Sequence, residues 1–263
     1  MRSLLIALLL ILSSNAMAGN IPHHATRHSI VHVVPPAFTT QSYLIADRNG
    51  VILKEHDSDL QRPIASISKL MVALIASDQD LDEELYIPIK RTVQSSIPRK
   101  QVSLTRRELL TMALIKSDNF AAQILCENIP NCIDAMNGRA YDLGMLHTHY
   151  EEPTGLSKEN VSTASDLLKL MLVAATNQTI TGLSSMPNAE IHVGKNTIKI
   201  RNTNPLTAKL DIILSKTGFT NPAGGCLVMA VNSPLGQRFL VLLGSRNAHT
   251  RIPEMEKLYK DMS

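Results

Sequence analysis

The sequence predicts a mixed α and β fold, in which both ends of the chain build one antiparallel sheet and a helical lobe is inserted between them. Strand-like apolar runs lie between Ser42 and Lys54 and again in the last third of the chain, whereas helical periodicity and capping residues fill the middle. The 263 residues are 44 % hydrophobic, enough for a sizeable core. Since we see no internal repeat or linker, we expect one domain over residues 41–263.

The first 18 residues have the pattern of a signal peptide. Arg2 supplies a positive start, Leu4 to Leu12 is a short apolar run, and Ala16-Met17-Ala18 is a cleavage motif that places the mature start at Gly19. The alternative is a retained N-terminal anchor. We expect export and no integral membrane segment after processing.

Residues 19–40 have little periodicity and are expected to form a flexible arm. Because the arm holds His23, His24, His28 and His32, a metal-binding tail is the alternative. We interpret His147 and His149 as surface residues and expect no metal and no cofactor. In an oxidising compartment Cys126 and Cys132 could form a disulfide that leaves Cys226 free. Three buried thiols are equally compatible with the sequence.

Local signals place the elements of the first two thirds. Asn49-Gly50 predicts the turn of a hairpin within 42–54, and Thr105 with Glu108 forms a capping box. One helix is expected to begin after Pro63. Others are expected over 109–116, over 120–126, between Pro130 and Gly144, and over 166–175, the last capped by Thr163.

The last third changes to strand-like runs at 198–200, 212–214, 227–231 and 239–243. Ser233-Pro234-Leu235-Gly236 predicts a hairpin turn. Thr250 is expected to cap a final helix over 253–261.

Ser66 and Lys69 form the first candidate catalytic pair. Residues three apart share one face of a helix, so the Lys69 amine can reach the Ser66 hydroxyl. A serine needs a base to become a nucleophile, and burial or a nearby cation can keep a lysine neutral enough to act as that base. A helix N-terminus would stabilise a developing oxyanion.

Two further motifs accompany this pair. Ser117-Asp118-Asn119 interrupts a helical region, and Lys216-Thr217-Gly218 ends an apolar strand-like run. Each motif is weak alone, and Ser117 could be a helix cap or Lys216 a surface lysine. Together, in this order, they match the trio of class A β-lactamases and penicillin-binding proteins.

The chain therefore resembles the serine DD-peptidases among the low-molecular-mass penicillin-binding proteins, and most of all the D-alanyl-D-alanine endopeptidase group. The resemblance covers about Ser42 to Ser263 and includes the segments 152–157, 201–204 and 216–226. It implies the β-lactamase/DD-peptidase-like fold, a five-stranded antiparallel sheet flanked by helices with an all-helical region.

The resemblance also implies roles for individual residues. Ser66 would attack the carbonyl carbon of a D-Ala peptide bond, Lys69 would accept its proton, and Ser117 would relay a proton to the leaving amine. Asn119 would bind the substrate amide, and Lys216 with Thr217 would hold the substrate carboxylate. Gly218 would let the strand approach the substrate closely. The main-chain N–H groups of Ser66 and Phe219 would form the oxyanion hole.

The implied partners are peptidoglycan muropeptides and, as covalent inhibitors, β-lactam antibiotics, in the periplasm. The formal charge of +3 and the 3 % aromatic content argue against nucleic acid. Alternatives to the endopeptidase are a carboxypeptidase that removes terminal D-Ala, a serine β-lactamase and a non-catalytic wall-binding protein. The β-lactamase is disfavoured because no Glu-x-x-Leu occurs between the second and third motifs.

Overall fold

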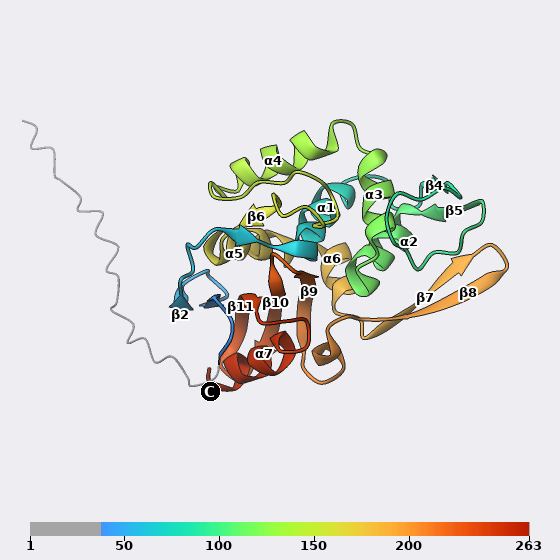
Figure 1. Cartoon of the computed structure of the whole chain (residues 1–263). Helices are drawn as coiled ribbons and strands as arrows, with labels where there is room; N and C mark the ends of the chain where they lie inside the picture. Colours follow the sequence, from blue (N-terminus) through green and yellow to red (C-terminus); the bar gives the residue numbers. More distant parts are fainter. Residues whose placement is uncertain (1–37, 263) are drawn as a thin grey trace, which may run out of the picture. The chain divides into compact units, whose positions relative to one another are not determined.

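The computed structural model describes residues 38–262, and its central feature is a five-stranded antiparallel sheet of order β2-β1-β11-β10-β9 (Figure 1). These strands are β1 (Ser42–Asp47), β2 (Ile52–His56), β9 (Ile212–Thr220), β10 (Gly224–Ser233) and β11 (Gly236–Ser245). The pairing of β1 with β11 joins the two ends of the chain, as the sequence predicts. The strand that carries the third motif, β9, lies at one edge of the sheet.

Three two-stranded sheets lie outside this main sheet. They pair β3 (Arg62–Pro63) with β6 (Val161–Ser162), β4 (Glu84–Ile87) with β5 (Val102–Thr105), and β7 (Asn188–Val193) with β8 (Asn196–Arg201). The run 198–200 therefore belongs to a separate hairpin, because the short turn at 194–195 returns β8 onto β7.

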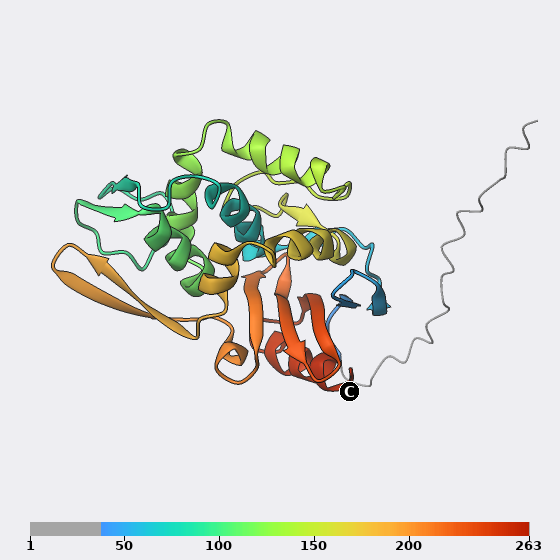
Figure 2. The same ribbon diagram turned by 180° about the vertical axis from the view of Figure 1, so that it is seen from behind.

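The helices are α1 (Lys69–Ala76), α2 (Arg106–Thr111), α3 (Asn119–Glu127), α4 (Cys132–Asp142), α5 (Ala164–Ala174), α6 (Gln178–Ser184) and α7 (Arg251–Lys260). Short 3-10 turns cover Ala65–Ser68 and Pro205–Ala208, and a π-helical turn covers Met112–Lys116. Figure 2 shows the helical lobe gathered at one end of the sheet, away from α7.

Both faces of the central strands β1, β10 and β11 are buried, which explains the long apolar run in each of them. Along β11, Leu240 and Leu242 pack with Met255 and Leu258 of α7, while Val241 on the opposite face joins the large core beneath the helical lobe. Side chains alternate between the faces of a strand, so burial on both sides removes the polar alternation expected of a half-exposed strand.

Most of the predicted elements are confirmed, and the exceptions have physical causes. The capping box at Thr105 and the cap of α5 by Thr163 are present. The helix expected over 109–116 is two elements, since α2 passes into the π-helical turn before Ser117. Thr250 precedes α7 as predicted, but its hydroxyl donates to the carbonyl of Asn247 and does not cap the helix.

The signal peptide and most of the histidine-containing arm lie outside the described residues. Within them, Thr39 donates from its main-chain N–H to the Glu254 carboxylate of α7 at 2.7 Å.

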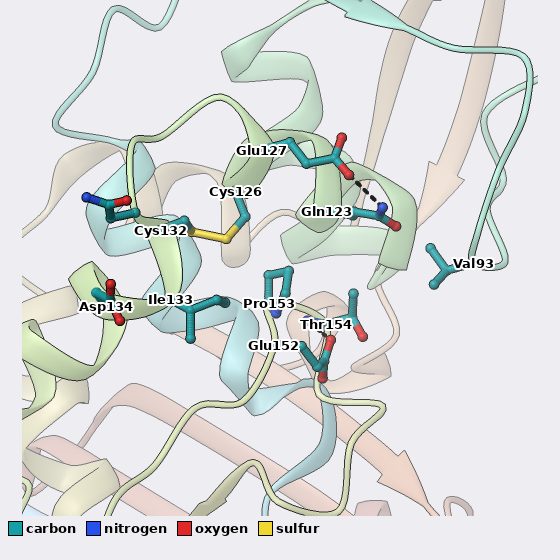
Figure 3. A pocket seen from close by; sticks show the side chains of 11 residues that line it. Val93, Gln123, Cys126, Glu127, Cys132, Ile133, Asp134, Glu152, Pro153 and Thr154 are labelled. Atoms are coloured by element: carbon teal, nitrogen blue, oxygen red, sulfur yellow. Dashed lines mark hydrogen bonds between the residues drawn. A yellow bond between two sulfur atoms is a disulfide. The ribbon is translucent and has the colours of Figure 1, made fainter.

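Cys126 and Cys132 form a disulfide (Figure 3), while Cys226 is a buried free thiol. Over residues 38–262 no helix has the length and apolar character needed to cross a membrane.

Candidate active site

Ser66 lies in the 3-10 turn that directly precedes α1, with its side chain partly accessible. The residue before it, Ala65, has a left-handed backbone with φ of +48°. A residue other than glycine pays a conformational cost there, so the surrounding structure must hold this turn in place. The sequence placed Ser66 at the start of the helix, and the structure places it one short turn earlier.

Lys69 is fully buried at the first position of α1, and its side-chain nitrogen has three oxygen neighbours. They are Ser66 Oγ at 2.7 Å, Asn119 Oδ1 at 2.8 Å and the main-chain carbonyl of Thr154 at 2.5 Å. Burial lowers the pKa of Lys69 to about 7, against the opposing effect of the Glu152 and Asp118 carboxylates. A large fraction of Lys69 can therefore be neutral near pH 7 and accept the Ser66 proton.

The second motif adopts a strained turn between two helices. Ser117 has φ of +59°, in the left-handed region, and ends the π-helical turn. Asp118 then caps α3 through the N–H of Ala121 at 3.0 Å, and its carboxylate also accepts from the N–H of Ser96 at 2.5 Å. This rigid turn presents the Ser117 hydroxyl, which accepts from Lys216 Nζ at 2.8 Å.

The third motif lies on the edge strand β9. Lys216 and Thr217 are buried, and Thr217 Oγ1 donates to Thr203 Oγ1 at 2.6 Å. Burial, with the positive charges of Lys69 and Arg251, lowers the pKa of Lys216 well below its usual value. An anionic group entering the site would counter this effect, which suits Lys216 to a carboxylate.

Gly218 allows β9 to pass close to Ser66. A Cβ atom at this position would lie 2.9 Å from the Ile64 carbonyl oxygen and 3.1 Å from the Ser66 nitrogen. The next residue, Phe219, has a side chain that is 42 % exposed. An edge strand with a free outer side can pair with an extended peptide.

The loop 152–157 also borders the site, because its Thr154 carbonyl accepts from Lys69. Both oxygens of Glu152 are occupied, since they accept from the N–H groups of Thr154 and Gly155 at 2.6 Å each and of Ser157 at 3.2 Å. Asn160 Nδ2 also donates to the Glu152 carbonyl at 2.7 Å and to Ser68 Oγ at 2.9 Å. These bonds fix the Thr154 carbonyl against Lys69.

The structure thus brings residues of all three motifs together. Lys69 joins Ser66 to Asn119, and Lys216 joins β9 to Ser117. This is an arrangement of nucleophile, base and cationic group suited to acyl transfer. Among residues 38–262 no cluster of three or more His, Cys, Asp or Glu is placed to hold a metal ion.

Comparison with known proteins agrees with this geometry. The model of the peptidase S11 family, D-alanyl-D-alanine carboxypeptidase, matches residues 29–247. The chain belongs to this family. It is a serine DD-peptidase of the penicillin-binding protein class.

The similar proteins cover most of the chain. It is 38 % identical over 232 residues to a D-alanyl-D-alanine endopeptidase of Pseudomonas aeruginosa, and the alignment covers 82 % of this chain and 75 % of that protein. It is 39 % identical over 243 residues to a D-alanyl-D-alanine endopeptidase of Escherichia coli, with 85 % and 77 % covered. Penicillin-binding protein D2 of Listeria monocytogenes, in its ampicillin-bound form, superposes with a TM-score of 0.78 at 28 % identity, covering 86 % of this chain and 98 % of that one.

Some residues of this S11 peptidase site were not predicted from the sequence. Glu152 and Thr203 lie in the segments 152–157 and 201–204, which carry the family resemblance. Nothing in the sequence indicated the contacts that these two side chains make. Arg251 had no signal: it lies at the start of α7, and its guanidinium donates to the Gly218 carbonyl at 2.7 Å. Arg251 thereby holds strand β9 beside Ser66 and adds positive charge near Lys216.

Proposed function

We propose that this S11 peptidase is an endopeptidase that hydrolyses D-Ala–diaminopimelate cross-links of peptidoglycan through an acyl-enzyme on Ser66. The observation that carries the proposal is the buried Lys69 nitrogen, 2.7 Å from Ser66 Oγ. The endopeptidase activity is favoured over terminal D-Ala removal by the two endopeptidases that are 38 % and 39 % identical to the chain.

In the acylation step, neutral Lys69 takes the proton of Ser66 while Oγ bonds to the carbonyl carbon of D-Ala. The N–H groups of Ser66 and Phe219 receive the resulting oxyanion, and one such donor typically contributes about 3 kcal/mol. Gly218 supports this arrangement, because its missing side chain leaves room beside the Ser66 nitrogen.

The leaving amine departs on the side of Ser117. The carbon–nitrogen bond breaks, and the proton held by Lys69 reaches the amine through the Ser117 hydroxyl. Lys216, bound to Ser117 Oγ at 2.8 Å, attracts the carboxylate beside that amine together with Thr217. Asn119 binds the substrate amide. A positioned acid or base of this kind is worth about 10²–10⁴-fold in rate.

Water then hydrolyses the acyl-enzyme to release the shortened peptide and restore Ser66. A penicillin would acylate the same serine and remain attached. Glu152 is the carboxylate of the 152–157 loop, and three main-chain N–H groups already donate to its oxygens. Hydrogen bonds to a carboxylate stabilise its charged form, which weakens Glu152 as a base for water. Turnover of the antibiotic would therefore be slow, unlike that of a β-lactamase.

The N-terminal pattern of residues 1–18 supports export, with the mature enzyme acting on the cell wall in the periplasm. An arm over residues 19–40 would then precede the catalytic domain.

The test is digestion of purified muropeptide dimers with the mature protein, followed by mass spectrometry, with Ser66→Ala alongside. The proposal expects monomers from the native enzyme and none from the variant, and a fluorescent penicillin adduct on the native protein alone. Loss of terminal D-Ala alone would make the enzyme a carboxypeptidase. No cleavage and no adduct would leave a wall-binding role.

A further inference from the structure

A pocket of about 500 Å³ lies where β11 ends, beside the residues that lead into β1. Two arginines line it, Arg62 of β3 and Arg246, which directly follows β11. Asn221, in the turn between β9 and β10, lines it as well. Neither Ser66 nor Lys216 belongs to its wall, and no step of the proposed reaction uses it. We call it the Arg62–Arg246 pocket.

The Arg62 guanidinium is held in place by its neighbours. It donates to Gln41 Oε1 and lies against the backbone of Gly244. A Cβ atom at position 244 would be 2.8 Å from Arg62 Nη2 and 2.9 Å from Arg62 Nε. Gly244 also has φ of +76°, a conformation that favours glycine. The missing side chain therefore leaves room for the guanidinium, which is oriented before any ligand arrives.

The positive charge of the pocket has no acidic partner in its wall. Among the described lining residues there is no Asp or Glu, and within residues 38–262 neither Arg62 nor Arg246 forms an ion pair. Arg62 Nε is buried and has no hydrogen-bond partner in this same part of the chain. Burial lowers the pKa of Arg62, as expected for a cation taken out of water. An anion in the pocket would offset this cost.

The Glu254 carboxylate does not serve as that anion. It accepts from the main-chain N–H and the hydroxyl of Thr39, and from the hydroxyl of Ser245. Thr39 and Ser245 line the pocket, so their hydroxyl hydrogens are already engaged with Glu254. The two arginines and the amides of Gln41 and Asn221 remain as donors for a ligand.

This set of donors fits a doubly charged oxyanion. A phosphate monoester carries a charge of about −1.5 to −2 at neutral pH, whereas a carboxylate carries a single charge. The planar guanidinium group matches the spacing of phosphate oxygens. The volume of the pocket leaves room for part of the alcohol that bears the phosphate.

We propose that the Arg62–Arg246 pocket binds the phosphate group of a phosphate monoester, with both guanidinium groups as ligands and the Asn221 amide as a further donor. The bound phosphate would join β3, which leads into the 3-10 turn of Ser66, to the chain that follows β11. The ester is either a soluble molecule or the headgroup of a lipid, and the test has one arm for each.

The first arm measures binding of glycerol phosphate to the mature protein by isothermal titration calorimetry, with glycerol and sodium chloride as negative controls. We expect Arg246→Gln to weaken binding by roughly ten-fold, because it removes a charged hydrogen-bond donor. Arg62→Lys keeps the charge, loses the planar fork and should also weaken binding. Arg48→Gln is the matched control, since Arg48 is an exposed arginine outside the pocket lining.

The second arm measures sedimentation of the protein with phosphatidylcholine vesicles that contain or lack phosphatidic acid. Binding of either phosphate probe that falls in Arg246→Gln and persists in Arg48→Gln supports the proposal and identifies the source of the phosphate. Binding of neither probe, or equal binding by Arg246→Gln and the native protein, would overturn it. A higher KM for muropeptide dimers in Arg246→Gln, without phosphate binding by the native protein, would assign the pocket to the substrate and also overturn it. These outcomes leave acylation of Ser66 untouched, so the proposed function stands or fails separately.

Discussion

The side-chain nitrogen of Lys69 lies 2.5 Å from the main-chain carbonyl oxygen of Thr154. A neutral amine has two N–H bonds and one lone pair. If its N–H groups donate to Thr154 O and Asn119 Oδ1, the lone pair is left to face Ser66 Oγ at 2.7 Å. In this arrangement the carbonyl of Thr154 would orient Lys69 as a base, and the bond from the Thr154 N–H to Glu152 holds the loop that carries this carbonyl.

We expect Glu152→Gln to reduce the rate of Ser66 acylation by roughly ten-fold or more. An amide has one acceptor oxygen, so its NH₂ group would oppose one of the main-chain N–H groups that the carboxylate now binds. The variant also removes a negative charge that raises the pKa of Lys69. The rise of the acylation rate with pH should consequently move to lower pH, as stopped-flow measurement with a chromogenic β-lactam would detect.

Glu151→Gln is the matched control for this prediction. The Glu151 side chain is 60 % exposed and pairs only with His149 at 3.5 Å among the described residues, so the substitution should leave the profile unchanged. An unmoved pH profile in Glu152→Gln would show that Glu152 acts on the fold alone.

The pH dependence of the native enzyme tests Lys69 as the base. Burial lowers the pKa of Lys69 from 10.5 to about 7, and only the neutral amine can accept a proton. The acylation rate should then fall about ten-fold per pH unit well below pH 7 and level off above it. A rate that keeps rising toward pH 10 would contradict this assignment.

Gly155, the glycine of the loop 152–157, is expected to tolerate no larger residue. It has φ of +80°, and a Cβ atom there would lie 1.9 Å from the Ala65 carbonyl oxygen. Gly155→Ala should lower the free energy of unfolding by at least about 2 kcal/mol and slow acylation, because the loop must move away from Ser66.

Gly138→Ala provides the contrast. Gly138 lies within α4, and a Cβ atom there would meet nothing within 4 Å. Alanine favours the helix, so stability should rise by about 0.5–1 kcal/mol. Urea denaturation compares the two variants, and equal destabilisation would refute the steric argument.

The Cys126–Cys132 disulfide should contribute about 2 kcal/mol to stability, the value expected for a loop with a sequence separation of 6. The double variant Cys126→Ala, Cys132→Ala should lose this amount in urea denaturation. Reductant should lower the native protein to the same level and leave the variant unaffected. Sensitivity of the variant to reductant would contradict this account of the disulfide.

The free thiol of Cys226 should stay unmodified by iodoacetamide at pH 8, because burial raises its pKa to about 11.

The features that the sequence predicted well are those decided by neighbouring residues. The Thr105 capping box, the Thr163 cap and the hairpin around Asn49-Gly50 each depend on groups a few positions apart. Ser66 and Lys69 belong to the same class, since a spacing of three residues brings their side chains together across the 3-10 turn that leads into α1.

Features that depend on the tertiary placement of a segment were not predicted from the sequence. The run 198–200 has the composition of a sheet strand, yet it pairs with β7 because partner choice depends on tertiary placement. The Cys126–Cys132 bond needed a geometry that spacing alone does not give. Arg251 reaches Gly218 across 33 positions of chain with no motif to mark it.

By itself the sequence determined which side chains are the candidates for the chemistry, because reactive groups must be particular residue types at particular spacings. Only the tertiary structure decided how Lys69 is aimed and how its pKa is lowered. The third hydrogen-bond partner of Lys69 is a main-chain carbonyl, a group that every residue possesses. Lys69 is buried because many residues from distant parts of the chain pack around it. No residue pattern can encode the position of a carbonyl that the folded loop 152–157 alone brings to the site.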